Sequence, residues 1–226
     1  MTKLLCRKIY GVLNATTLFG RGQLIKYLEQ EIVPDCSSLL DLGCGSNSAI
    51  SRFSSKIPYR MGVDIFDNSI RLSKKNNIHN EYIKIDILDI ENEFKEKSFD
   101  CVIAIDLIEH FSKEDGLKLL RTMEKISKKK VVIFTPNGFV PQNEYGGNRY
   151  QVHLSGWSYK EMVNMGFRLI GIGGWKILRG ERGEIVWRPK ILWFVISRLT
   201  HFYTRNHPEH AFSILCIKKL VEHLSL

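Results

Sequence analysis

One stretch decides the fold of this chain: Leu39-Leu40-Asp41-Leu42-Gly43-Cys44-Gly45-Ser46-Asn47. Its apolar run ends at an acidic residue, and two glycines that flank one small residue follow. An apolar run bounded by turn residues predicts a buried strand, and glycines allow the backbone to turn tightly after it. A tight turn between a strand and a helix lets a nucleotide-like cofactor lie against exposed N–H groups. The stretch therefore predicts a cofactor site at the end of a buried strand.

Apolar runs alternate with polar helical stretches through the rest of the chain, which predicts an α/β protein with a mainly parallel sheet. We expect residues 1–33 to be helical and Pro34-Asp35 to end that segment. A helix capped by Ser158 and Glu161 is expected to end at Gly166. The other expected helices lie near residues 47–54, 69–77 and 113–126, and the expected strands near 37–42, 60–64, 82–86, 99–105, 130–135, 167–175 and 211–218.

Composition limits the class of protein. The 226 residues, 44% hydrophobic and 25% charged, are typical of a soluble globular protein that buries a sizeable core. No 18-residue apolar run and no signal-peptide pattern is present, so we expect neither a membrane-spanning helix nor secretion. Five scattered cysteines without CxxC spacing argue against a disulfide framework and a zinc site, and favour a reducing cytosol. The net charge of +9 is compatible with nucleic acid, an anionic membrane, acidic substrates or a solvated surface.

One segment, residues 178–208, stands apart as an expected helical insertion between the last two strands. It is basic, and it carries an apolar stripe at helical spacing: Leu192, Val195, Ile196, Leu199, Phe202 and Tyr203. We expect one helix of about four turns, packed on the sheet, because apolar stripes usually belong to a core. The alternative is a helix that lies at a membrane interface, or a lid over an apolar substrate. The neighbouring Trp187 and Trp193 favour this alternative.

Three carboxylates follow the first three expected strands: Asp41, Asp64 and Asp86. In an open α/β sheet, ligands bind outside the carboxyl ends of the strands, so these three groups can reach one crevice. An acid after the second strand can accept hydrogen bonds from both ribose hydroxyls. An acid after the third strand can accept one from an adenine amine. The three acids therefore predict a ligand that contains adenosine.

The glycine spacing separates two kinds of adenosine cofactor. A dinucleotide fingerprint needs a third glycine, and Ser48 occupies that position. Asp41 would repel a pyrophosphate, whereas it suits a cofactor with a positive amino or sulfonium group.

These residues resemble the class I S-adenosylmethionine (SAM)-dependent methyltransferases. Asp41-Leu42-Gly43-Cys44-Gly45 is similar to the first motif of that family, although Asn47 replaces a third glycine often found there. Asp64-Ile65 and Asp86-Ile87 match its ribose- and adenine-binding positions. The segment from Phe99 to Ile105-Asp106 and on to Glu109-His110 matches its fourth-strand motif. The resemblance implies a Rossmann-like seven-stranded sheet of order 3-2-1-4-5-7-6, with the last strand antiparallel, in a single domain over residues 1–226. It implies a site for SAM, and for its product S-adenosylhomocysteine, at the residues named here.

We expect the acceptor site in a long loop after the fifth strand, residues 135–157, because long loops at strand ends tend to be functional. We expect His153 as a general base, with His110 as a second catalytic candidate. Acceptor-binding groups are expected from the same loop: Asn148, Arg149, Tyr150 and Trp157. No resident metal is expected. A small-molecule, glycan or lipid-linked acceptor methylated at oxygen fits best, in a cytoplasmic protein that contacts a membrane through residues 188–205 if the acceptor is lipidic.

Three other functions remain open at the level of sequence. An RNA or protein methyltransferase is one, but the (Asp/Asn)-Pro-Pro-aromatic motif of amino-directed nucleic-acid enzymes is replaced by Ile105-Asp106-Leu107-Ile108. An NAD-binding oxidoreductase is the second, although it lacks the third glycine. A SAM-binding protein without activity is the third.

Overall fold

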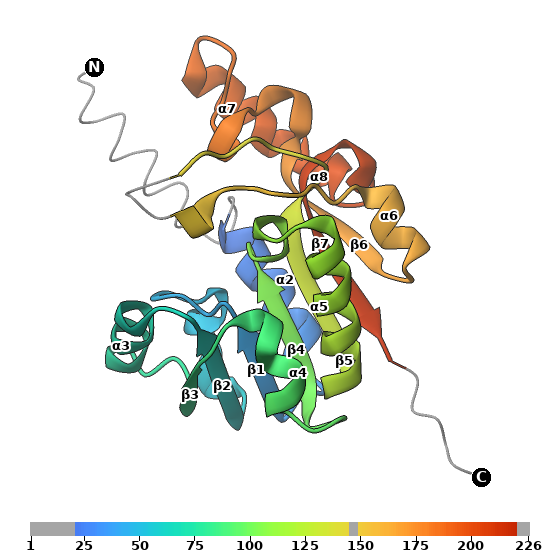
Figure 1. Ribbon diagram of the computed structural model, residues 1–226. Helices are drawn as coiled ribbons and strands as arrows, with labels where there is room; N and C mark the ends of the chain where they lie inside the picture. Colours follow the sequence, from blue (N-terminus) through green and yellow to red (C-terminus); the bar gives the residue numbers. More distant parts are fainter. Residues whose placement is uncertain (1–20, 145–148, 221–226) are drawn as a thin grey trace.

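The computed structural model describes residues 21–144 and 149–220, whose strands form one sheet (Figure 1). The strand order is β3-β2-β1-β4-β5-β7-β6. Only β7 runs antiparallel to its neighbours, β5 and β6. The strands are β1 (Ser38–Leu42), β2 (Tyr59–Asp64), β3 (Glu81–Lys84), β4 (Phe99–Ile105), β5 (Ser127–Pro136), β6 (Arg168–Trp175) and β7 (Ala211–Lys219). The predicted sheet order and the antiparallel last strand are confirmed.

Helices cover both faces of the sheet, as the alternating apolar runs predict. On one face, α5 (Lys113–Ile126) packs with α4 (Ile90–Glu93) and α6 (Tyr159–Asn164) against alternate residues of the central strands. On the other face, α2 (Arg21–Ile32) packs against the intervening residues. Side chains alternate between the two cores because successive residues of a strand point to opposite faces. In β4, for example, Val102 and Ala104 join one core, while Cys101 and Ile103 join the other.

The expected helix near residues 47–54 is wrong. Two short 3-10 turns, Ala49–Arg52 and Ser54–Lys56, occupy this segment. The Ser48 hydroxyl accepts the N–H of Ile50 and donates to Asp41, so side-chain bonds replace part of the helical pattern. The next expected helix is present as α3 (Asp67–Lys75), and α5 has the predicted bounds, with Ser112 as its N-cap.

The insertion after β6 forms two helices, α7 (Lys190–Leu199) and α8 (His201–Thr204), instead of one continuous helix. Both lie close to β6 because it carries glycines there. A Cβ at Gly171 would lie 2.0 Å from the carbonyl oxygen of Thr204, and one at Gly174 would lie 1.9 Å from that of Ser197. At the junction, the Thr200 hydroxyl donates to the Ser197 carbonyl oxygen at 2.9 Å. The helices therefore approach the strand backbone to backbone, which only glycine permits.

The apolar stripe of this insertion points away from the sheet, so the expectation of a core-facing stripe is wrong. The side of α7 and α8 that packs on β6 carries Phe194, Ser197, Arg198, His201 and Thr204. Small side chains face the glycines of β6. Phe194 packs with Leu178 and Ile185 of the same insertion, and most of the other large apolar side chains are left outside. This α7–α8 apolar face, at the top of Figure 1, consists of side chains that are between 47% and 68% exposed: Ile191, Leu192, Val195, Leu199 and Phe202.

In the described part of the chain, no helix is both long enough and apolar enough to span a membrane.

A buried histidine on α8 gives the fold a predictable response to acid. Burial, and then the positive charges of Arg205 and Arg198, lowers the pKa of His201 to about 4. The ring also lies 6.2 Å from that of Tyr27 on α2. In the unfolded chain the same ring binds a proton near its ordinary pKa, so unfolding takes up a proton between the two values.

We therefore expect the contribution of His201 to the free energy of unfolding to be complete above about pH 6.5 and to be lost as the pH drops toward 4, by on the order of 3 kcal/mol. Urea unfolding of the wild type and a variant at several pH values measures it. His201→Gln should lose this pH-dependent difference, so its slope should differ from that of the wild type in this window. His210→Gln, at an exposed position, should leave it unchanged. Equal slopes in wild type and His201→Gln would contradict the assignment.

Candidate active site

The turn after β1 leaves space for a ligand beside one glycine. Gly43 and Gly45 have φ of +63° and +60°, a region that favours glycine. A Cβ at Gly43 would lie 2.7 Å from Cδ1 of Leu107, whereas a Cβ at Gly45 would have no atom within 4 Å. The first glycine is therefore required by packing, and the second borders open space at the carboxyl end of the sheet.

Asp64 ties this turn to the end of β2. Its Oδ2 accepts the Gly45 N–H at 2.8 Å, and its Oδ1 accepts the Phe66 N–H at 2.9 Å. Each carboxylate oxygen can accept further hydrogen bonds, so the group remains able to bind hydroxyls. Ile65, next to it, is half-buried.

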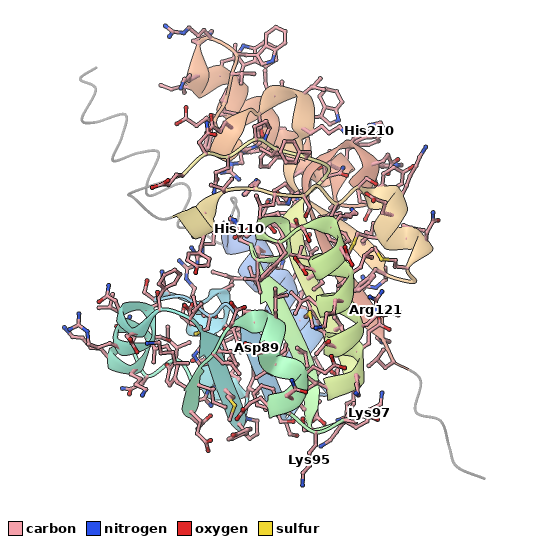
Figure 2. All side chains as sticks on the ribbon, viewed as in Figure 1. Asp89, Lys95, Lys97, His110, Arg121 and His210 are labelled. Carbon is pink, nitrogen blue, oxygen red and sulfur yellow. The ribbon has the colours of Figure 1, made fainter. Side chains whose placement is uncertain are left out.

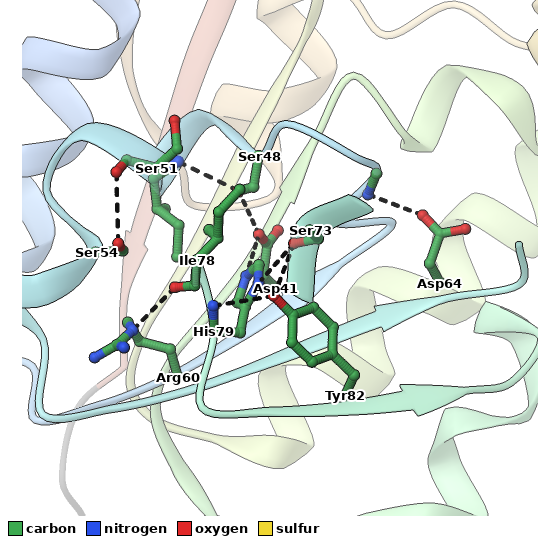
Figure 3. A network of polar contacts seen from close by, with 12 residues as sticks. Asp41, Ser48, Ser51, Ser54, Arg60, Asp64, Ser73, Ile78, His79 and Tyr82 are labelled. Atoms are coloured by element: carbon green, nitrogen blue, oxygen red, sulfur yellow. Dashed lines mark hydrogen bonds and ion pairs between the residues drawn. The ribbon is translucent and has the colours of Figure 1, made fainter. Parts of the chain in front are cut away.

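Asp41 lies at the centre of a buried polar network (Figure 3). Its Oδ2 accepts the Ser48 hydroxyl at 2.5 Å and Nε2–H of His79 at 2.9 Å. The Ser73 hydroxyl lies 3.4 Å from Nδ1 of His79 and 2.9 Å from the hydroxyl of Tyr82. The network joins β1 to the loop before β3. A direct contact of Asp41 with a cofactor stays a prediction.

Two other expected cofactor residues bury their side chains. Cys44 is 3% exposed, and burial, followed by the nearby Asp41 and Asp64, raises the pKa of its thiol, so it is no nucleophile. Ile87 is 6% exposed and belongs to the core. Asp86 is half-buried and caps the turn after β3, where its Oδ1 accepts the Leu88 N–H at 3.0 Å. The side chains of Cys44 and Ile87 are thus buried in the protein, and a contact of either residue with a cofactor stays a prediction.

A cavity of about 520 Å³ opens at the carboxyl ends of β4 and β5. Ile105 and Asp106, both expected at the cofactor, line it. The insertion after β6 forms part of its wall. Six polar residues of that wall come from five separate segments: Arg21, Asp106, Glu109, His153, Arg179 and Arg198. We call it the strand-end cavity.

Two carboxyl groups of this cavity lie in an environment that disfavours their ionisation. Asp106 is solvent-accessible but surrounded by protein, and this partial desolvation raises its pKa to about 6, against the charge of Arg21. Burial raises the pKa of Glu109 to about 8, with the charge of Asp106 as the second cause. The Thr135 hydroxyl donates to Oε2 of Glu109 at 3.1 Å. Asp106 also has φ of +52°, a left-handed conformation that is uncommon outside glycine but that Asp adopts more often than most residues.

The structure brings both predicted catalytic histidines together at the cavity. The ring centroids of His110 and His153 are 4.9 Å apart. Nδ1–H of His110 donates to the Val152 carbonyl oxygen at 3.1 Å, and Nδ1–H of His153 donates to that of Val140 at 2.7 Å. Burial lowers the pKa of both rings, so both are neutral near pH 7.

The comparisons with known proteins agree with this geometry. Residues 40–135, from β1 to β5, match the family model described as a methyltransferase domain. The match covers less than half of the chain, and it agrees with the resemblance of these residues to the class I SAM-dependent methyltransferases. It supports methyl transfer with SAM as donor. A search of the curated proteins finds no match.

Solved methyltransferase structures share the fold. A SAM-dependent methyltransferase from Archaeoglobus fulgidus superposes with a TM-score of 0.57 at 18% identity, over 93% of this chain and 99% of its own. A putative methyltransferase from Haloferax volcanii, in complex with the Trm112 methyltransferase activator, gives 0.55 at 15% identity over 90% and 95%. Magnesium protoporphyrin IX methyltransferase from Synechocystis PCC 6803 gives 0.50 at 11% identity over 89% and 78%. At these identities the likeness shows the fold alone.

The described residues fit the cofactor of this methyltransferase family. The open space beside Gly45 admits a ligand against the backbone, and Asp64 offers acceptor oxygens at the end of the next strand. The sequence interpretation missed His79, which lies 38 positions from its partner Asp41 and has no motif around it. It also left Glu109 out of the site, although the Glu-His pair of the fourth-strand motif contains it.

The acceptor-binding residues expected from the loop after β5 have different outcomes. Asn148 and the side chain of Arg149 lie outside the described residues. Tyr150 is 46% exposed, and its ring packs edge-on against Phe66 with centroids 5.3 Å apart. Trp157 is fully buried in the core below Lys113, and its Nε1–H donates to Ser155, so its expected contact with the acceptor is wrong. Its large apolar ring fills a core position that the loop itself covers.

A methyl group added at Gly45 tests the open space beside the turn. We expect Gly45→Ala to weaken binding of S-adenosylhomocysteine at least tenfold, or about 1.4 kcal/mol, because the new Cβ occupies ligand space. Isothermal calorimetry measures the affinity. Gly138→Ala is a matched control, since Gly138 also has a positive φ, +94°, and open space around its missing Cβ. Unchanged affinity in Gly45→Ala, or equal losses in both variants, would overturn this placement.

Proposed function

We propose that this methyltransferase transfers a methyl group from SAM to a hydroxyl oxygen of a lipid-linked acceptor held in the strand-end cavity. The proposal rests on the insertion after β6, whose helix α7 faces the cavity on one side and solvent on the other. Arg198 of α7 lines the cavity, while Leu192, Val195 and Leu199 of the same helix are exposed on the outside. One helix thus lines the cavity on one side and carries an apolar surface on the other. A small soluble molecule or a glycan without a lipid would use the same cavity but would leave that surface without a role.

The cofactor side of the proposal uses the strand ends. We expect the backbone of Gly43, Cys44 and Gly45 to border SAM, as the open space beside Gly45 supports. Asp64 would accept the ribose hydroxyls, with Ile65 beside it. Asp86 and the backbone of Ile87 would hold the adenine, and Ile105 and Asp106 would bound the end nearest the acceptor. When bound, SAM supplies a methyl group on a positive sulfur.

The chain's own residues must then orient the acceptor and remove its proton. Methyl transfer is an in-line displacement, so alignment of donor and hydroxyl in a dry site can supply most of the acceleration. His153 is the proposed base: its Nδ1–H is held by Val140, which leaves the Nε2 lone pair to accept the hydroxyl proton. His110, in ring contact with it, would help to hold it in place.

The size and position of the cavity favour this acceptor class over macromolecules. A volume of about 520 Å³ is in the usual range for small-molecule sites. An RNA or protein acceptor would need an extended surface around the site, whereas one wall of this cavity is the helix that carries the α7–α8 apolar face. The net charge of +9 agrees with an anionic membrane as well as with nucleic acid.

The α7–α8 apolar face is the proposed membrane contact, at the cytoplasmic side of the inner membrane. Trp187 lies next to it with its ring centroid 5.4 Å from that of Trp193, and aromatic rings of this kind favour the membrane interface. Arg188, Lys190 and Arg205 are exposed around the face. An apolar helix face surrounded by basic residues is typical of peripheral binding to anionic lipid.

Removal of the proposed base should abolish turnover without loss of cofactor. We expect His153→Ala to reduce transfer of labelled methyl from SAM into a cell extract by about 10²- to 10⁴-fold. S-Adenosylhomocysteine affinity should remain within a factor of two or so, because the ring lies on the acceptor side. His207→Ala, at a partly exposed position beside Glu209, is the control and should transfer at the wild-type rate. Full turnover in His153→Ala would exclude His153 as the base.

Vesicle flotation tests the membrane contact. The wild-type chain should float with vesicles of phosphatidylcholine and phosphatidylglycerol and much less with phosphatidylcholine alone. The triple variant Leu192→Ser, Val195→Ser, Leu199→Ser should stay unbound. Val163→Ser, on α6 and 49% exposed, serves as the control and should float. If the wild type remains unbound, or pairs with a second copy through this face as the concentration rises, the membrane contact is wrong.

A further inference from the structure

Three side chains with metal-binding atoms meet at the wall of the strand-end cavity: Glu109, His110 and His153. One ligand atom from each lies within 4.8 Å of the other two. Glu109 and His110 come from the turn after β4, where Figure 2 labels His110, and His153 comes from the loop after β5. Two imidazoles and a carboxylate on adjoining loops are a common donor set for divalent transition metals.

Each imidazole already has the tautomer that a metal ligand needs. Nδ1 of His110 lies 3.1 Å from the Val152 carbonyl oxygen, and Nδ1 of His153 lies 2.7 Å from that of Val140. A carbonyl oxygen can only accept, so Nδ1 carries the hydrogen in both rings. The neutral rings therefore keep their lone pairs on Nε2. Histidines that bind metals usually donate their other N–H to such a partner, which fixes the ring and its tautomer.

The carboxylate is fixed in the same way. Glu109 is 3% exposed, and the Thr135 hydroxyl donates to its Oε2 at 3.1 Å. Its backbone carbonyl accepts the N–H groups of Leu154 and Ser155, at 2.8 and 3.1 Å. These two bonds hold the loop that carries His153 against the turn that carries His110. All three side chains are thus oriented by partners that are not themselves in the ligand set.

We propose that Glu109, His110 and His153 bind one divalent transition-metal ion, and that a coordination position of this ion opens into the strand-end cavity. The N,N,O donor set favours ions such as Zn²⁺, Mn²⁺, Fe²⁺ or Co²⁺ over Mg²⁺ and Ca²⁺, which prefer oxygen donors. Bonds of about 2.0–2.2 Å require ligand atoms about 3–3.5 Å apart, so the side chains close by about 1 Å on binding. Asp106, on the same cavity, adds a carboxylate that favours positive charge nearby.

The ion gives the proposed methyl transfer a second way to activate its acceptor, and this part rests on the proposed function. An acceptor hydroxyl in the open position loses its proton to solvent more readily because the cation stabilises the oxyanion. That oxygen forms the new bond to the methyl carbon of SAM as the carbon–sulfur bond breaks, and the sulfur keeps the electron pair. The metal is unchanged. This route replaces the base role of His153, because its single Nε2 lone pair either accepts the proton or binds the ion; with the ion bound, the proton goes to solvent.

Cobalt binding tests this proposal without SAM or an acceptor. We expect the metal-free full-length chain to bind one equivalent of Co²⁺, with visible absorption bands of a nitrogen- and oxygen-coordinated ion. The affinity should fall about 10- to 100-fold or more in His153→Ala and in His110→Ala. His153 is the first choice because its ring is only partly buried, and the unfolding temperature of each variant checks the fold. The matched control is His207→Ala, His210→Ala, which removes two histidines beside Glu209 on the surface.

Each outcome has a defined meaning. Loss of cobalt binding in the cavity variants alone supports the site. No cobalt binding, equal binding in His153→Ala, or loss only in the His207→Ala, His210→Ala variant overturns it. Methyl transfer at the wild-type rate by a chain that binds no cobalt would overturn the metal site and leave the proposed function. One bound cobalt in a chain that transfers no methyl group to any pool would retain the site and overturn the function.

Discussion

The 2.8 Å hydrogen bond from the Gly45 N–H to the Asp64 carboxylate is the interaction on which the rest of the site depends. It joins the turn after β1 to the end of β2 and is made possible by the positive φ of Gly45. Without it, the glycine turn would have no fixed position relative to the acid that is proposed to accept the ribose. Because neighbouring parallel strands end at the same edge, this single bond aligns two parts of the cofactor site.

The polar network around Asp41 also stabilises the carboxyl end of β1. A buried carboxylate costs free energy unless it is paired, and here Ser48 and His79 both donate to it. Its partners come from the turn after β1 and from the loop before β3, so one acid joins β1 to two other segments. The Asp41 that the sequence assigns to the cofactor thus has a clear structural role in the fold. On the other side of β4, the turn with Glu109 and His110 is fixed to the loop after β5 by backbone hydrogen bonds, which joins the acceptor side to the sheet.

Local patterns in the sequence predict most of the fold. The positions of the strands, β4 among them, follow from apolar runs and turn residues, and α5 follows from its cap and its helical spacing. The family resemblance supplies the strand order and the antiparallel last strand. What fails depends on contacts between distant residues. The outward direction of the α7–α8 apolar face is set by Gly171 and Gly174 of β6, and the burial of Trp157 is set by a core that its loop closes. The pairing of His79 with Asp41 has no local signal at all.

The central claim is the chemical class of the methyl acceptor, and one experiment tests it directly. The full-length enzyme is incubated with methyl-labelled SAM and a cell extract, and the extract is then separated into lipid, glycan, protein and RNA pools. We expect the label to enter the lipid pool as an O-methyl group, in proportion to the S-adenosylhomocysteine released. Label confined to RNA or protein, or no transfer to any pool, would contradict it.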